Sequence, residues 1–132
     1  MGKMKFVICQ TSGELEKLQA MASLAGGAAT IDMEVHVFLA MDALTAFKKD
    51  VIEKRAWKTS GEVGEALLKS DMPTFIEYLK EAKKVGKIKI YACEATMNLL
   101  GLSKEDLSDV IDEVIGLMGF FEIASGGQLI TL

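Results

Sequence analysis

Short apolar runs rich in β-branched and aromatic residues alternate along this chain with segments of helical spacing, and this alternation constrains the fold more than any other feature. The run "KMKFVICQ" precedes "TSGELEKLQAMASLAGG", and "DMEVHVFLA" precedes "MDALTAFKK". Strands that alternate with helices require right-handed crossovers, which produce a parallel sheet covered by helices on both faces. The 132 residues, half of them hydrophobic, suffice for one core. We therefore predict a single α/β domain of three layers over residues 1–132, with a mainly parallel sheet.

The boundaries of the predicted elements follow from the period of the apolar residues. Strands are predicted over residues 3–10, 32–40, 87–92, about 110–114 and 128–132. Helices are predicted over residues 11–27, 41–49 and 73–86, directly after Cys93, and in the apolar stretch after residue 114. In the first helix, Thr11 and Glu14 have the spacing of a capping box, and Gly26 and Gly27 are expected to end the helix. Its core-facing positions are Leu15, Leu18, Met21, Ala22 and Ala25.

The segment 50–72 is the least regular part of the sequence. A loop of this length in a small domain is typically a lid, a contact surface or a mobile segment. It contains Trp57, which we interpret either as a substrate or subunit contact or as a side chain that folds back onto the core.

Charge and hydropathy exclude two classes of partner. The formal net charge is −4, so the chain lacks the broad positive field that binding to nucleic acid requires. The basic stretch 48–58 is interrupted by acidic residues and is interpreted as a solvated surface. The apolar run at the amino terminus is much shorter than the roughly 20 residues that span a bilayer, and no cleavage site follows it. We therefore expect no membrane partner and a cytoplasmic location.

The two cysteines, Cys9 and Cys93, are predicted to be free thiols, since a chain of this size folds without a structural disulfide. Cys93 directly follows the predicted strand in "KIKIYACEATMNLLG" and directly precedes a helix, at the end of a parallel strand where ligands bind in α/β sheets. A helix amino terminus lowers a thiol pKa from about 8.5 toward about 5–7, whereas the carboxylate of Glu94 in the same turn raises it. Cys93 is thus either a reactive thiol or a small buried apolar residue.

Cys9 lies inside an apolar run and is predicted to belong to the core. A disulfide between Cys9 and Cys93 remains a possible alternative if their strands are adjacent.

His36 lies within a predicted strand and is interpreted as a histidine satisfied by polar neighbours rather than a general base. Five methionines lie at core-facing spacings and are interpreted as packing residues: Met21, Met33, Met41, Met97 and Met118.

Several known chemistries lack their motifs in this sequence. There is no Cys-x-x-Cys pair for a dithiol oxidoreductase, and neither cysteine is followed six residues later by the arginine of a phosphatase loop. Ile90 stands where a peroxiredoxin has threonine. One histidine and two scattered cysteines do not have the spacing of zinc ligands. Neither of the nucleotide-binding motifs GxxxxGK[ST] and GxGxxG occurs. We therefore expect no metal and no cofactor.

The stretch "KIKIYACEATMNLLGLSKEDL" resembles the DsrE/DsrF-like family of small sulfur-relay proteins, particularly at the strand–cysteine–helix junction. "EVHVFLAMDALTAFKKD" is similar to the second strand and helix of that family, and "IASGGQLITL" is similar to its last strand. The resemblance implies a five-stranded α/β/α domain that forms trimers or hexamers. It also implies that Cys93 accepts sulfane sulfur as a persulfide and passes it on.

The functional prediction is therefore a sulfur-relay protein, a persulfide carrier or sulfurtransferase, with Cys93 as the acceptor. Its expected partners are a sulfur-donor or sulfur-acceptor protein or a small sulfane-sulfur compound, and further copies of the chain. Ser12, Met41 and Trp57 are predicted substrate contacts. The alternatives are a non-catalytic oligomeric binding module with a buried cysteine and a peroxiredoxin-like thiol reductant. The apolar stretch "GLMGFFEIA" suggests either a subunit interface or ordinary core.

Overall fold

The computed structural model describes residues 4–132 and contains a five-stranded sheet in which all paired strands are parallel. The strands lie in the order β4-β3-β2-β1-β5. Their bounds are β1 Lys5–Gln10, β2 Glu34–Leu39, β3 Ile88–Cys93, β4 Glu113–Ile115 and β5 Gln128–Thr131. The helices are α1 Leu15–Thr30, α2 Asp42–Thr45, α3 Lys49–Lys54, α4 Glu62–Lys69, α5 Phe75–Val85, α6 Glu94–Leu100, the short 3-10 helix η1 Lys104–Asp106, and α7 Leu117–Ala124. The predicted α/β class is confirmed.

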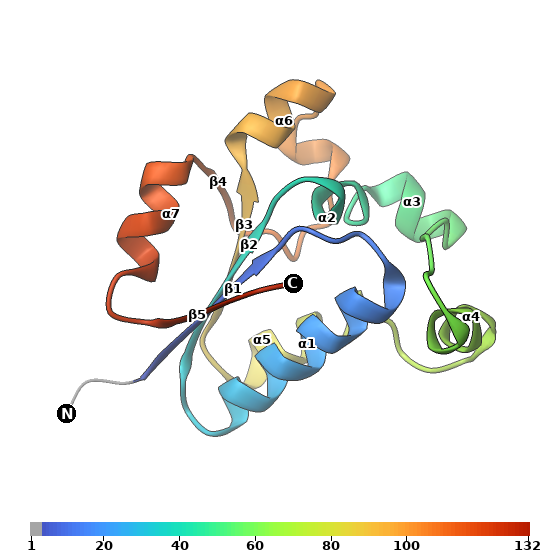
Figure 1. Ribbon diagram of the computed structural model, residues 1–132, viewed down its shortest axis with the longest axis horizontal. Helices are drawn as coiled ribbons and strands as arrows, with labels where there is room; N and C mark the ends of the chain where they lie inside the picture. Colours follow the sequence, from blue (N-terminus) through green and yellow to red (C-terminus); the bar gives the residue numbers. More distant parts are fainter. Residues whose placement is uncertain (1–3) are drawn as a thin grey trace.

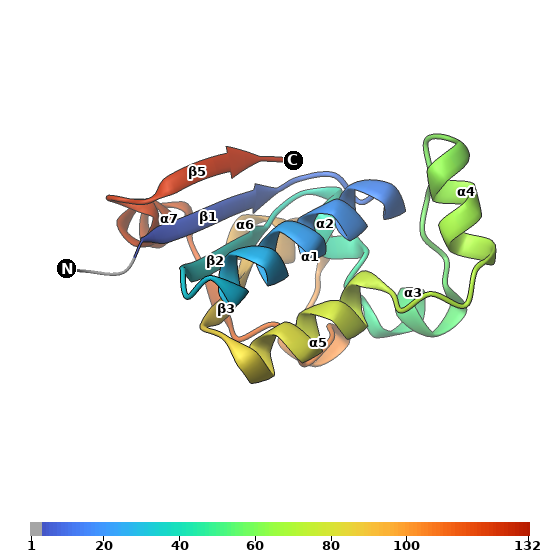
Figure 2. The same cartoon turned by 90° about the horizontal axis from the view of Figure 1, so that it is seen from below.

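The helices form the outer layers of a three-layer arrangement (Figure 1). Helices α1 and α5 pack side by side on one face of the sheet, which we call the α1–α5 face. Helix α7 lies on the opposite face, here called the α7 face, in the connection that carries the chain from β4 back to β5 beside β1. Figure 2 shows α3 and α4 standing beyond the end of the sheet.

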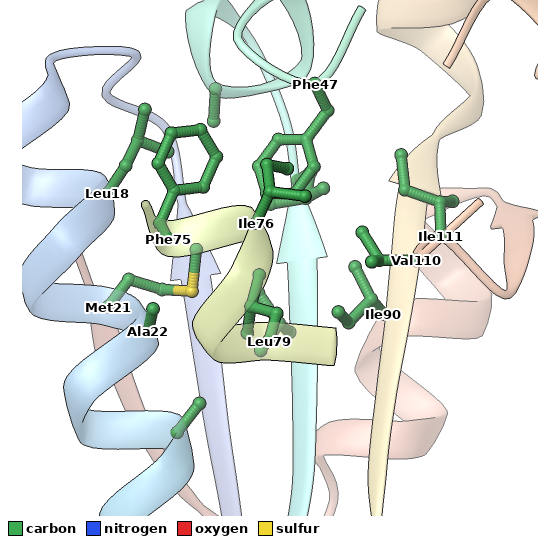
Figure 3. Packing of buried hydrophobic residues seen from close by; sticks show 14 of the residues in the cluster. Leu18, Met21, Ala22, Phe47, Phe75, Ile76, Leu79, Ile90, Val110 and Ile111 are labelled. Carbon is green, nitrogen blue, oxygen red and sulfur yellow. The ribbon is translucent and has the colours of Figure 1, made fainter. Parts of the chain in front are cut away.

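The main core fills the space between the sheet and the α1–α5 face. All five positions predicted to face the core in α1 are buried. Phe75 of α5 is fully buried and packs edge-on against both Phe47 and Trp57, with ring centroids 5.2 Å apart in each pair. Figure 3 shows Phe75 beside Leu18 of α1. These aromatic contacts therefore join α5 to the segments on either side of α3.

A smaller cluster lies beneath α7. Phe120 stacks on Phe38 of β2 with ring centroids 4.3 Å apart and an interplanar angle of 14°. Val7, Ala40 and Tyr91 complete the buried part of this cluster. The alternation of side chains along each strand therefore supplies one apolar set to each face of the sheet.

The predicted end of the first helix is wrong, because α1 continues through Gly26 and Gly27 to Thr30. Each glycine costs a helix interior roughly 1 kcal/mol relative to alanine. Buried alanines flank the glycine pair at helical spacing and pack toward α5: Ala25, Ala28 and Ala29. Tertiary packing therefore outweighs the local preference.

The segment 50–72 is not the irregular loop that its sequence suggested, because most of α3 and all of α4 lie in it. The predicted helix over 41–49 is correspondingly split between α2 and the start of α3. The Arg55 guanidinium donates a hydrogen bond to the Leu68 carbonyl at 3.0 Å, which ties the two helices together. The strand predicted near 110–114 begins at Glu113 instead, since Val110 and Ile111 are buried in the main core.

Across residues 4–132, no helix has both the length and the apolar character needed to cross a membrane.

Replacing Phe75 with alanine is predicted to lower the free energy of unfolding by about 3–5 kcal/mol, because it removes a fully buried ring and leaves a cavity between Phe47 and Trp57. Tyr78→Ala, on the partly exposed side of the same helix, is the matched control and should cost less than about 1 kcal/mol. Chemical denaturation followed by circular dichroism measures both changes. Equal losses for the two variants would contradict the assignment of the core.

Candidate functional site

Cys93 is the last residue of β3 and the N-cap of α6, so the predicted strand–cysteine–helix junction is confirmed. Its backbone is extended, with φ −71° and ψ 118°, and Glu94 begins the helix without an intervening loop. The thiol is free and half-buried. Cys93 therefore stands at the carboxyl edge of the sheet with part of its surface open to a reactant.

The Cys93 side chain lies on the α7 face, packed against the small apolar cluster beneath α7. The strand register pairs Cys93 with Ile115 of β4, which packs against the same cluster. Glu94 lies near the start of α7, since a methyl group at Gly116 would stand 3.9 Å from its Oε1. The thiol is therefore bordered by an apolar wall.

The corner after β2 contacts α6, the helix that begins after Cys93. The Met41 N–H donates a hydrogen bond of 3.2 Å to Oγ1 of Thr96, which is buried in α6. Met41 has φ 57° and ψ −139°, a conformation that side-chain-bearing residues rarely adopt. Strained backbone of this kind is concentrated at functional sites.

The prediction that five methionines pack in the core is wrong for two of them. Met41 is 62% exposed and Met118 is 80% exposed, whereas Met21 and Met97 are buried. Met41 sits on a corner and Met118 on the outer side of α7, and neither position could be read from the spacing alone. Met41 is nevertheless on the surface at the carboxyl edge, and its predicted contact with substrate stays a prediction.

Cys9 lies on the α7 face too, but β2 separates its strand from that of Cys93. Two strand spacings place the β1 and β3 backbones roughly 9–10 Å apart, beyond the Cα separation of about 4.4–6.8 Å that a disulfide spans. Both thiols are free, so the open question of a Cys9–Cys93 disulfide is answered against it. Burial, and secondarily the charge of Cys93, raise the pKa of the Cys9 thiol.

His36 is satisfied by polar neighbours, as predicted. Its Nδ1 lies 2.8 Å from the Tyr91 hydroxyl and its Nε2 lies 3.1 Å from Oε1 of Glu34. The ring is buried and stacks on Tyr91. Burial, and then the negative charges of Glu113, Asp112 and Glu34, raise the pKa of Tyr91 to about 12. His36 therefore belongs to a buried polar pair below the thiol and not to a Cys–His dyad.

A cavity of about 350 Å³ opens near the carboxyl ends of β1 and β2. Ser12 and Trp57, two of the predicted substrate contacts, both line it, whereas Met41 and Cys93 do not. Trp57 also packs on the core, which confirms the second interpretation of this residue, whereas its contact with a substrate or subunit stays a prediction. Its indole N–H donates a hydrogen bond of 3.0 Å to the Ala46 carbonyl.

The cavity contains charged residues that the sequence did not single out as ligand contacts. Glu14, Lys17, Asp42 and Lys58 line it. Glu14 was predicted to form a capping box with Thr11, which is wrong, because the Thr11 hydroxyl donates to the Leu132 carbonyl instead. The Glu14 N–H donates to the Ser12 hydroxyl at 3.1 Å. The signal that marks Glu14 is structural, since its Oε2 is buried and accepts no hydrogen bond from residues 4–132.

No group of three or more His, Cys, Asp or Glu side chains within residues 4–132 is arranged to hold a metal ion.

These features define a small three-layer α/β protein with a half-buried cysteine at the end of its third strand. The profile of the DsrE/DsrF-like family matches residues 4–132, and the chain belongs to this family, which is associated with sulfur relay. The uncharacterised protein YrkE from Bacillus subtilis strain 168 is 30% identical over 145 aligned positions, covering 89% of each chain.

Two solved structures share the fold. The protein of unknown function MTH1491 from Methanobacterium thermoautotrophicum superposes with a TM-score of 0.64 at 11% sequence identity. The ychN protein from E. coli superposes with a TM-score of 0.63 at 16% identity. Each comparison covers 98% of this chain and 100% of the other, so the likeness extends over the whole architecture.

The phenol of Tyr91 is predicted to ionise with a midpoint at about pH 12. The folded protein holds this proton more tightly than the unfolded chain, whose tyrosine pKa is about 10, so stability is lost as the pH rises from about 10 to about 12. Tyrosinate absorbance of Tyr78→Phe, which keeps only one of the two tyrosines, measures the midpoint. A midpoint near pH 10 in protein shown by circular dichroism to be folded would contradict the buried hydroxyl.

Proposed function

We propose that this chain is a sulfur-relay protein in which Cys93 accepts sulfane sulfur as a persulfide and passes it to a partner. The observation that carries the proposal is the position of Cys93: a free, half-buried thiol at the carboxyl end of β3 and at the edge of the apolar cluster beneath α7. Membership of the DsrE/DsrF-like family supports it. The partner is a sulfur-donor or sulfur-acceptor protein or a small sulfane-sulfur compound, and we place the reaction in the reducing cytoplasm.

The transfer requires only thiol chemistry. The Cys93 thiolate attacks the outer sulfur of a donor persulfide, a new sulfur–sulfur bond forms, and the donor's sulfur–sulfur bond breaks. The electron pair of the broken bond leaves on the donor thiolate, so the two cysteines exchange one sulfur atom without net oxidation. The same step in reverse delivers the sulfur to an acceptor thiol. The apolar wall beside Cys93 would limit the access of water to the persulfide.

Cys93 suits this role better than Cys9. The pKa of Cys9 is raised by burial, which lowers the fraction of thiolate available at neutral pH. Cys9 also lies within β1, whereas Cys93 ends its strand. The two cysteines therefore offer a matched pair for experiment.

Incubation with a persulfidated donor protein or with polysulfide is predicted to add mass to Cys93 in steps of one sulfur atom. Cys93→Ser should lose this uptake, because serine cannot form the sulfur–sulfur bond. Cys9→Ser is the control and should retain at least half of the wild-type uptake. Intact-protein mass spectrometry with peptide mapping measures the result.

Sulfur uptake by Cys93→Ser equal to that of the wild type would overturn the proposal. Slow alkylation of native Cys93, with no persulfide formed, would favour the non-catalytic binding module. Rapid peroxide consumption that depends on Cys93 would favour the thiol reductant.

We further propose that the chain acts as a homo-oligomer, a trimer or hexamer, joined through the outer side of α7. Three apolar side chains of α7 are at least 60% exposed: Leu117, Met118 and Phe121. Exposed apolar side chains that gather on one short helix are typical of an interface. Because α7 covers the cluster that contacts Cys93, a neighbouring subunit at this helix would lie on the same face of the sheet as the thiol.

Introducing a charge with Phe121→Glu is predicted to shift the protein from an oligomer to a monomer, since a carboxylate cannot be buried in an apolar interface without a partner. Val63→Glu, at a position 66% exposed on α4, is the control and should leave the oligomer intact. Light scattering coupled to size-exclusion chromatography measures the mass. A wild-type protein that is monomeric at micromolar concentration would rule out this interface.

A further inference from the structure

The cavity near the carboxyl ends of β1 and β2 lies apart from Cys93. Its walls come from the loop after β1, from α2 and from the segment 56–58 that precedes α4. Figure 2 shows the amino-terminal end of α1 at the same end of the molecule as α2, α3 and α4. A volume of about 350 Å³ is at the small end of the range for ligand sites, so it suits a single small molecule.

Backbone and side-chain hydrogen bonds hold the cavity walls in place. The Leu15 N–H donates to the Lys58 carbonyl at 2.8 Å, and Glu14 and Lys58 form an isolated parallel bridge. The Glu16 carboxylate accepts hydrogen bonds of 3.0–3.1 Å from the N–H groups of Ser60 and Gly61. The segment that carries Trp57 is thus fixed to the start of α1. A preformed site loses less entropy when a ligand binds.

The carboxylate of Glu14 identifies one group of the ligand. Its Oε2 is buried and accepts no hydrogen bond from the described part of the chain. A buried carboxylate oxygen without a donor is costly, and a small rotation of the side chain toward the cavity would let an ammonium or other N–H donor relieve that cost. Asp42 adds a second carboxylate to the lining of the cavity. This pair favours a positively charged group on the ligand.

Other residues of the lining identify the remaining groups. Lys17 and Lys58 line the cavity, and the ammonium group that each carries suits a ligand carboxylate. Trp57, Val51 and Ala56 add an apolar surface. A purely anionic ligand would be repelled by the carboxylates of Glu14 and Asp42, and a purely cationic ligand would be repelled by the two lysines. The mixture of charges favours a zwitterion.

We propose that this cavity binds a small α-amino acid, with its ammonium group at Glu14 and Asp42 and its carboxylate at Lys17 and Lys58. The side chain of the ligand lies along the apolar surface that includes Trp57. Because Cys93 is not among the residues that line the cavity, this site does not depend on the sulfur-relay proposal.

Trp57 provides a direct measurement, because it is the only tryptophan in the sequence and it lines the cavity. Each of the twenty standard L-amino acids is tested by thermal shift, and those that raise the melting temperature are titrated against Trp57 fluorescence, or by calorimetry where the ligand itself fluoresces. We expect at least one to give saturable binding. Its N-acetyl and carboxamide derivatives should each bind with an affinity at least about tenfold lower, since each lacks one charge.

Two variants test the assigned contacts. Glu14→Gln should weaken binding about tenfold, while Glu62→Gln, an exposed carboxylate outside the cavity, should leave it unchanged. Lys17→Gln, at an exposed position on α1, should also weaken binding. Lys54→Gln, at an exposed position outside the cavity, is its control and should leave binding unchanged. Circular dichroism checks that each variant is folded.

The proposal is overturned if none of the twenty amino acids changes either the melting temperature or the Trp57 signal. Wild-type affinity in both Glu14→Gln and Lys17→Gln would overturn it too. Equal binding of the N-acetyl derivative would show that the site recognises an anion and not a zwitterion.

Discussion

The parallel pairing of β2 with both β1 and β3 is the interaction on which the rest of this structure depends. Parallel strands deliver the residues that follow them to one edge of the sheet. Ser12 after β1, Met41 after β2 and Glu94 after β3 therefore reach the same end of the molecule. The same pairing separates the two cysteines, because β2 stands between their strands. One set of backbone hydrogen bonds thus places these residues at one edge and keeps the thiols from closing into a disulfide.

The two faces of the sheet are covered unequally, and this difference gives them different roles. Helices α1 and α5 pack against each other and seal one face over the larger core. On the other face α7, with eight residues, covers the smaller cluster and leaves Cys9 and Cys93 half-buried. A thiol that must meet another molecule is better placed on the second face. The exposed apolar side of α7 lies on that face as well, so the proposed subunit contact and the proposed sulfur transfer involve the same part of the molecule.

Sequence patterns predicted those features that depend on neighbouring residues. The strand ending at Cys93, the helix that follows it and the buried positions of α1 all follow from local periodicity and are confirmed. The errors lie where distant contacts decide. Gly26 and Gly27 stay helical because α1 packs on α5. The segment 50–72 folds into helices, of which α4 is held to α1 at its start by Glu16. The cavity depends on Lys58 pairing with Glu14, two residues far apart in the sequence, so no local pattern could reveal it.

The two candidate sites meet at the corner that follows β2. The Met41 N–H binds Thr96 in the helix that begins after Cys93, and the next residue, Asp42, lines the cavity. Met41 holds an unfavourable φ of 57°, a conformation that costs of order 1–3 kcal/mol and persists only where surrounding contacts require it. Space next to Asp42 is also restricted, because a methyl group at Gly13 would collide with the Asp42 carbonyl. Relaxation of Met41 to an ordinary φ would therefore displace the Thr96 contact on one side and the cavity wall on the other, so both sites depend on the same backbone conformation.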